Sequence, residues 1–488
     1  MAQWTSSVGA ARMARLLASG GPGRGPAYRR LAAGVRSLVT EGGVPVGARL
    51  PAERELARAL GVSRTTVAAA FEVLREEGFL RSRRGAGSWT ALPSGHVEPA
   101  QGVHPVAVEH AGRVIDLGSA ALAAPEPWLS LAARGAAEEL AAFTGSHGYY
   151  QAGLPALREE LAARYTARGV PTAPEQILVS SGGAMGALTL LMGLLVRPAD
   201  RVAVEAPGYA NVLAMLARCG ARRVPVGIGA GGWDMEAWRR VLREAAPRLA
   251  YVIPDFHNPT GVLVGDDQRR ELVERARAVG AVVLVDETMV DLALDPWITP
   301  ARPVAAFDRA GSTVVTVGSA GKVFWGGLRI GWVRAAPALV RRMAAARVCV
   351  DLGTPVLEQL VVLRLLTDHL EPVLGAQRDR LRAGRDALAV ALRRELPEWE
   401  FTVPGGGMTL WVRTAGLSGS RLAAAGERLG VRLASGPRFG VDGAFESFLR
   451  LPFTVGEAVA REAVARLVTA ASEVREGGAA EETEVFVA

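Results

Sequence analysis

Short apolar runs alternate with amphipathic helical segments from about residue 114 onward. The runs lie at residues 176–180, 201–205, 249–254, 281–286 and 313–318. Strands that are apolar on both faces and separated by helices are typical of a largely parallel sheet with helices on both sides. The sequence therefore predicts a large α/β domain over residues 114–475.

The N-terminal part of the chain has a different pattern, in which helices precede a glycine-tipped ribbon. Residues 1–26 predict a short helix and a Gly/Pro-rich segment. Three helical segments follow, with Ser63 placed to cap the third, and two short strands close the pattern. Helix, helix, glycine turn, helix and β-ribbon is the order of a winged helix-turn-helix, which we expect over residues 27–92.

The remaining segments predict a linker between the two domains and a C-terminal tail. Residues 93–113 are rich in Pro, Gly, His and Glu without periodicity and predict a linker, and residues 476–488 predict an acidic tail. We expect no membrane span and no secretory signal. The two cysteines, Cys219 and Cys349, stand alone, so we expect a reduced, cytoplasmic protein without a metal site.

Charge is distributed unevenly along the chain and between residue types. Residues 27–92 hold eleven arginines and six acidic residues, and a basic excess in a small module favours a nucleic-acid partner. Of the 56 basic residues in the chain, only Lys322 is a lysine. Arginine cannot form an imine, whereas a lysine amine can lose its proton and attack an aldehyde. Lys322 is therefore a candidate reactive residue.

Residues 49–67, together with Leu74-Arg-Glu-Glu-Gly-Phe-Leu80 and the glycine wing, resemble the GntR family of bacterial repressors. The resemblance implies binding to double-stranded DNA through the third helix and the wing. Ala52 stands where the family usually has serine. The implied DNA-binding residues are Arg54, Ser63, Arg64, Thr65, Thr66, Arg83 and Arg84. A helical protein–protein module with a solvated arginine face is the alternative.

Ser319-Ala-Gly-Lys322, with Arg329 seven residues later, resembles the lysine segment of fold type I pyridoxal-phosphate enzymes, the aspartate aminotransferase superfamily. The resemblance implies that Lys322 is the catalytic residue and forms the internal aldimine with pyridoxal 5'-phosphate. Ser319 and Arg329 would hold the phosphate group, through a hydroxyl and through charge-assisted hydrogen bonds. A surface lysine beside glycines is the alternative.

Four further segments match the same superfamily. Asp286 ends an apolar strand and would pair with the pyridinium nitrogen; Thr288 stands where a tyrosine is frequent. Asn258, in His257-Asn-Pro-Thr-Gly261, would donate to the phenolic oxygen of the cofactor. The other implied cofactor contacts are the stacking ring of Tyr209 and the backbone amides of Gly183 and Ala184 at a helix start. A helix cap, a turn and an ordinary packed tyrosine are the structural alternatives.

Two features concern the effector and the oligomer. Arg450, in Phe448-Leu-Arg450-Leu-Pro-Phe453, resembles the arginine that binds a substrate carboxylate, although a surface arginine is the alternative. Tyr149 and Tyr150 match a region that reaches across a homodimer interface in this fold. The sequence does not decide which of the two would do so.

A GntR-like winged helix joined to an aminotransferase-like domain is the layout of the MocR/GabR regulators, which the chain resembles over nearly its whole length. The resemblance implies a homodimeric transcriptional regulator that senses an amino acid, an amine or the cofactor itself at Lys322. One alternative is a true aminotransferase with an accessory DNA-binding domain. The other is a repressor whose C-terminal domain only dimerises.

Overall fold

The computed structural model describes residues 6–18, 25–83, 87–93 and 114–484. Its N-terminal part is a winged helix, as the sequence predicts. The elements are α2 (Ala27–Thr40), α3 (Glu53–Leu60), α4 (Arg64–Glu76), β3 (Leu80–Arg83) and β4 (Gly87–Thr90). Gly61 ends α3 in the left-handed region at φ 66°, and the Ser63 hydroxyl accepts a hydrogen bond from Thr66 N at the start of α4.

The segment before α2 completes this small domain. Strand β1 (Ser6–Ser7) pairs in parallel with β2 (Ala48–Arg49), which adds two strands to the ribbon of β3 and β4. Helix α1 (Ala10–Ala18) then buries Met13 in the same core as Phe71 of α4. Residues within 1–26, in which the sequence shows only a short helix and a break, therefore contribute to the winged-helix core.

An eight-stranded sheet forms the centre of the large domain. Its order is β6 (Ile177–Ser181), β13 (Ile330–Arg334), β12 (Val314–Ser319), β11 (Val282–Asp286), β10 (Leu249–Val252), β7 (Arg201–Ala206), β8 (Arg222–Gly229) and β9 (Gly232–Trp233). Only β13 and β9 pair antiparallel with their neighbours. The five apolar runs of the sequence correspond to β6, β7, β10, β11 and β12, so the predicted α/β class is confirmed.

Each central strand is buried on both faces. In β11, Val283 and Val285 belong to one hydrophobic core and Leu284, between them, belongs to a second core. Successive side chains of a strand point to opposite faces of the sheet, so a helix layer on each side requires apolar residues at every position. This burial explains why the runs show no alternation of polar and apolar residues.

A second sheet brings the C-terminal part of the chain beside the first. It consists of β14 (Thr409–Arg413), β16 (Phe448–Pro452), β15 (Val431–Ser435) and β5 (Ile115–Leu117). Helices α13 (Leu370–Glu395), α14 (Gly419–Arg428) and α15 (Glu457–Glu484) pack together at this end of the molecule. Helix α15 continues to Glu484, so most of the segment predicted as a tail is helical.

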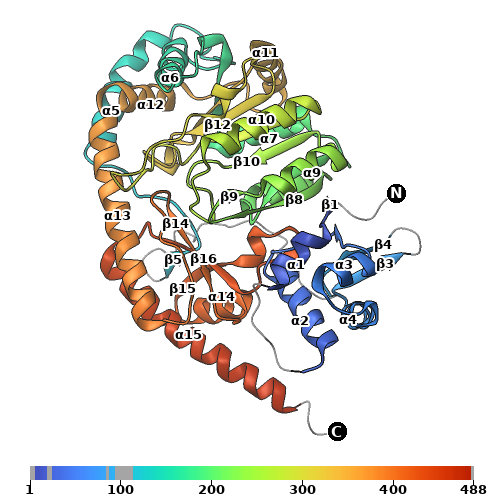
Figure 1. The fold of residues 1–488 in the computed structure, drawn as a ribbon. Helices are drawn as coiled ribbons and strands as arrows, with labels where there is room; N and C mark the ends of the chain where they lie inside the picture. Colours follow the sequence, from blue (N-terminus) through green and yellow to red (C-terminus); the bar gives the residue numbers. More distant parts are fainter. Residues whose placement is uncertain (1–5, 19–24, 84–86, 94–113, 485–488) are drawn as a thin grey trace.

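The winged helix packs against the large domain of the same chain through α1, α2 and β1, with α4 and the ribbon on the far side (Figure 1). Phe445 N donates a hydrogen bond to Thr40 O at 2.7 Å, and its buried ring belongs to the winged-helix core. The ion pairs Arg413–Glu41 and Arg12–Asp234 flank this contact. Among the described residues, no helix is long and apolar enough to cross a membrane.

Candidate functional site: a pocket around Lys322

Lys322 lies just beyond β12, at the edge of a pocket of about 410 Å³ between the two sheets of the large domain. Its Nζ donates a hydrogen bond to Ala120 O at 2.6 Å. Burial and the positive charge of Arg450 lower the pKa of Lys322 to about 8, although Asp286 opposes that shift. The amine can therefore lose its proton near neutral pH, which makes it a competent nucleophile.

Asp286 ends β11 and lines the same pocket, where its carboxylate is buried. Its Oδ2 accepts a hydrogen bond from the Tyr251 hydroxyl at 2.8 Å, and its Oδ1 accepts one from Thr288 N at 3.0 Å. Burial raises the pKa of Asp286, while these hydrogen bonds and Lys322 act in the opposite direction. The carboxylate is thus fixed in orientation and poised to pair with a cationic group.

Four of the predicted cofactor contacts gather at the start of α7 (Gly183–Leu195). Gly183 has φ 67°, and a Cβ on it would lie 3.6 Å from Ser319 Oγ and 3.7 Å from Arg329 Nη1. Arg329, with φ 54°, donates from Nη2 to Gly182 O, and its own carbonyl accepts from Gly183 N at 2.7 Å. Ala184 also lines the pocket. A helix start with a hydroxyl and a guanidinium beside it favours a phosphate group.

Asn258 and Tyr209 lie in the pocket wall as predicted. Asn258 precedes Pro259 in a cis peptide, and its Oδ1 accepts from Arg450 Nη1 at 3.5 Å. The Tyr209 hydroxyl accepts a hydrogen bond from Asn211 Nδ2 at 3.2 Å, and burial raises the pKa of that hydroxyl. These residues come from two different loops that follow β7 and β10.

Arg450 reaches the pocket from β16 of the second sheet and is 2% exposed. Its Nη2 donates to Gly118 O, its guanidinium carbon lies 5.0 Å from the Phe439 ring centroid, and burial lowers its pKa to about 10. Its Nε has no hydrogen-bond partner among the described residues. A buried guanidinium that faces a pocket and has an N–H group without a partner favours an anionic ligand group.

Sequence reasoning missed three contributors to the pocket. Tyr251 lies mid-strand in β10 and orients Asp286, Ala120 accepts from Lys322, and Asn211 binds the Tyr209 hydroxyl. A tyrosine in an otherwise aliphatic strand was the available signal for Tyr251. Tyr149 is 57% exposed, and neither it nor Tyr150 lines the pocket of this single chain.

The predicted DNA-binding residues lie on the exposed side of the winged helix. Ser63 and Thr65, at the start of α4, are exposed, and Thr66 beside them is partly so. Arg64 is exposed and pairs through Nε with Glu53 Oε2 at 3.3 Å. The exposed side chains of Arg54 and Arg83 come from α3 and β3. Arg84 lies outside the described residues.

Comparison with known families agrees with this architecture. Residues 113–467 match "Aminotransferase class I and II", and residues 27–89 match "Bacterial regulatory proteins, gntR family". The chain belongs to the class I and II aminotransferase family. It carries a GntR helix-turn-helix in front of the aminotransferase domain, which is the architecture of the MocR-type regulators.

Relatives of two kinds match the chain. It is 29% identical to the "Probable rhizopine catabolism regulatory protein MocR" of Rhizobium meliloti, over 77% of this chain and 78% of that protein. It is 31% identical to the 2-aminoadipate transaminase of Thermus thermophilus, over 59% of this chain and 73% of that protein. The solved structure of LysN, an α-aminoadipate aminotransferase from Thermus thermophilus complexed with N-(5'-phosphopyridoxyl)-L-leucine, superposes with a TM-score of 0.69. That structure is 27% identical and covers 77% of this chain and 96% of its own.

The cofactor of this family is pyridoxal phosphate, and the pocket residues fit it. The glycine turn, Ser319 and Arg329 provide a place for a phosphate group, and the buried carboxylate of Asp286 and the amine of Lys322 line the same pocket. No group of three or more His, Cys, Asp or Glu residues suited to a metal ion occurs in the part of the chain that the structure describes.

Proposed function

We propose that this protein is a transcriptional regulator that senses an amino-bearing effector, or pyridoxal phosphate itself, through covalent chemistry at Lys322. The observation that carries the proposal is the joining of two features in one chain. A partly buried amine of lowered pKa lines a pocket that Arg329 and Arg450 also line, and a winged helix packs on the same domain. A domain that served only for dimerisation would not require Lys322 and Asp286 to line the same pocket.

We assign the pocket residues as follows. The Ala184 amide, Ser319 and Arg329 hold the phosphate at the glycine turn, where the Gly183 amide itself donates to Arg329 O. Asp286 pairs with the ring nitrogen, Asn258 contacts the phenolic oxygen, and Tyr209 packs on the ring. When bound, the cofactor supplies an aldehyde that condenses with a primary amine with loss of water, and a ring that accepts electrons. Lys322 provides one such amine and the effector would provide a competing one.

Arg450 would bind the carboxylate of an amino-acid effector, because it is buried and faces the pocket. An effector that takes the place of Lys322 and binds Arg450 would connect the two sheets, because Arg450 lies in the second sheet and Lys322 follows a strand of the first. Such a ligand changes DNA affinity only to the extent that it binds one arrangement of the domains better than another.

DNA would be bound by the start of α4 in the major groove and by the ribbon beside it. Arg64, Thr65 and Thr66 would contact base edges or phosphates, while Arg54 and Arg83 would contact the backbone or a minor groove. A homodimer formed through the aminotransferase-like domains would pair two such winged helices. Binding to the chromosome implies a cytoplasmic location.

The alternative function is transamination. The nearly complete pocket and the 31% identity to a named transaminase support it, whereas Thr288 in place of tyrosine weakens it. An assay with an amino acid and a 2-oxo acid distinguishes the two functions. Sustained turnover with an ordinary pair supports the enzyme, and one stoichiometric reaction without turnover supports the sensor.

The decisive experiment compares the full chain with Lys322→Arg, which keeps a positive charge but cannot form an imine, and with Lys322→Ala. Imine absorbance and operator binding are recorded with and without cofactor and candidate amines. Since Lys322 is the only lysine, borohydride reduction can fix cofactor only there or on the N-terminal amine. We expect imine absorbance, and a change of operator binding on addition of the amine, in the natural chain and in neither variant. A Lys322→Arg variant that still responds to the amine contradicts the proposal.

A further inference from the structure

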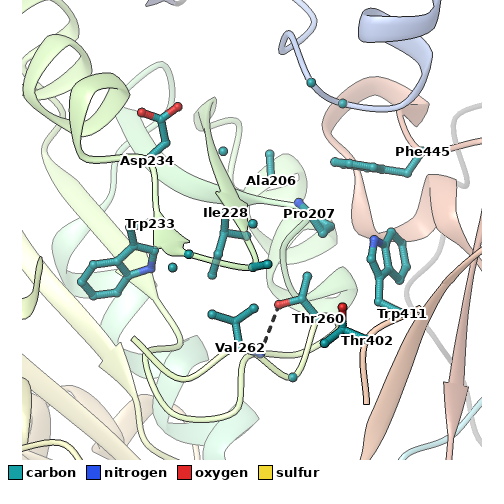
Figure 2. Close-up of a pocket in the computed structure, with 18 of the residues that line it drawn as sticks. Ala206, Pro207, Ile228, Trp233, Asp234, Thr260, Val262, Thr402, Trp411 and Phe445 are labelled. Carbon is teal, nitrogen blue, oxygen red and sulfur yellow. Dashed lines mark hydrogen bonds between the residues drawn. The ribbon is translucent and has the colours of Figure 1, made fainter. Parts of the chain in front are cut away.

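A second cavity, of about 680 Å³, lies between the winged helix and the large domain (Figure 2). Its walls come from α1, from the loop after α2, from the end of β8 and the loop to β9, and from the second sheet with Phe445 beside it. The segments 206–207, 260–263 and 402–405 complete them. It shares no lining residue with the pocket around Lys322. Its volume is within the roughly 300–1,000 Å³ typical of small-molecule sites, which occur preferentially between domains.

The walls of this interdomain cavity are mainly apolar and partly aromatic. The apolar and aromatic side chains are those of Leu16, Ala206, Pro207, Ile228, Ala230, Trp233, Val262, Leu263, Val403, Pro404, Trp411, Phe445 and Phe448. Figure 2 shows Trp411 and Phe445 on one side of the cavity and Ile228, Val262 and Trp233 on the other. Such a lining favours a flat or apolar ligand.

The charged side chains in the lining are already paired. Arg12 pairs with Asp234 across the two domains, and Glu41 pairs with Arg413 at 2.8 Å while it accepts a hydrogen bond from Ser37. A charged ligand would have to lose its hydration and also break one of these pairs, which is costly. The lining also holds the hydroxyl groups of Thr260 and Thr402, and the Thr260 hydroxyl already bonds His257 Nδ1 and Val262 N. The lining therefore selects an uncharged ligand.

The aromatic wall also extends to the effector arginine. The Trp411 ring stacks on the Phe448 ring, with 5.0 Å between centroids. It packs edge-on against Phe445 at 5.8 Å and against Phe439 at 5.6 Å. Phe439 in turn lies beneath the guanidinium of Arg450. A ligand that moves this wall therefore acts on both the winged-helix contact at Phe445 and the pocket around Lys322.

We propose that the interdomain cavity is a second small-molecule site, which takes an uncharged aromatic or apolar compound and whose occupancy changes DNA affinity. The ligand would contact α1 and the loop after α2 on one side and the large domain on the other. It thus stabilises the docked arrangement of the winged helix in preference to any other. A molecule with such differential affinity must shift the equilibrium between arrangements. The site does not require the chemistry proposed at Lys322.

The test uses N-phenyl-1-naphthylamine, an uncharged aromatic probe whose fluorescence rises in apolar sites, with the purified full chain. We expect saturable binding of one probe per chain, and a change of DNA affinity within the roughly 5- to 150-fold range typical of coupled sites. Val262→Trp fills the cavity and should abolish saturable binding. Val279→Trp places the same bulk at an exposed residue directly after α10 (Asp266–Ala278) and should leave binding unchanged.

Two further variants keep the outcome interpretable. Leu16→Trp fills the cavity from the winged-helix side and should also abolish binding, which covers the case in which Val262→Trp fails to fold. Lys322→Ala should bind the probe normally, so loss of cofactor chemistry and loss of this site are separate results. Probe binding that survives both filling variants, or no saturable binding in the natural chain, overturns the site. Binding without any change in DNA affinity overturns its regulatory role.

Discussion

The guanidinium carbon of Arg450 lies 5.0 Å from the centroid of the Phe439 ring, and Phe439 in turn packs edge-on against Trp411. The arginine proposed to bind an effector carboxylate is therefore supported by an aromatic cluster. The same cluster contacts the winged helix through Phe445, whose amide donates to Thr40 O. Ligand binding and winged-helix docking thus share one packed group of side chains.

Burial of Lys322, together with the charge of Arg450, sets a pH dependence for cofactor attachment. The Lys322 pKa is about 8, below its usual value, and only the neutral amine attacks an aldehyde. The association rate of pyridoxal phosphate with cofactor-free protein should therefore rise with pH and level off above about 8. In Arg450→Ala the repulsive charge is gone, so the midpoint should move to higher pH. Stopped-flow absorbance measures both profiles; Arg341→Ala, on the exposed face of α11 (Pro337–Ala346), should not shift the midpoint.

Tyr251→Phe should weaken cofactor binding through Asp286. The hydroxyl of Tyr251 is a hydrogen-bond donor to the buried carboxylate and lowers its pKa, so its removal should raise the Asp286 pKa further. Loss of one such bond costs about 1 kcal/mol, roughly fivefold in Kd. Titration of cofactor absorbance against pH measures both effects. Tyr165→Phe removes another buried hydroxyl, which accepts a hydrogen bond from Trp332 Nε1 and does not bond Asp286, and should leave the titration unchanged. An identical result for both variants would contradict the role of Tyr251.

Gly183→Val should weaken binding of the cofactor phosphate. The residue has φ 67°, which a β-branched side chain rarely adopts, so the substitution strains the turn beside Ser319 and Arg329. We expect cofactor affinity to fall by at least tenfold, measured by equilibrium dialysis. Gly193→Val is the matched control, because Gly193 lies in the same helix with open space beside it. Affinity in Gly193→Val should be that of the natural chain.

Arg64→Ala and Arg54→Ala should affect DNA binding differently. If Arg64 reads a base, its loss costs about 1–3 kcal/mol and reduces discrimination between operator and unrelated DNA. If Arg54 contacts only the backbone, its loss should weaken binding to both sequences equally and lower the salt dependence. Fluorescence anisotropy with both duplexes at several salt concentrations measures these quantities. If both variants show the same ratio of operator affinity to affinity for unrelated DNA, Arg64 does not contact a base.

Local patterns in the sequence were sufficient for the elements and for much of the pocket. Residues 313–318 predict β12 because their apolar character is continuous, and Gly61 and Ser63 predict the turn between α3 and α4 because each satisfies a helix end. The spacing of Ser319, Lys322 and Arg329 is likewise local. The predictions of helices and strands succeed because the interactions that form these elements lie between residues close together in sequence.

The tertiary structure decided everything that depends on distant segments meeting. The approach of Arg450 to Asn258, the hydrogen bond from Tyr251 to Asp286, and the inclusion of Met13 and Phe445 in one core join residues far apart in sequence. The interdomain cavity exists only because α1 and α2 pack on the large domain. The sequence determined which chemistry the chain carries, because reactive groups are properties of single residues and short motifs. Only the fold decided which charges face one another, and hence the pKa of Lys322, because electrostatic interactions depend on distance and burial rather than on sequence order.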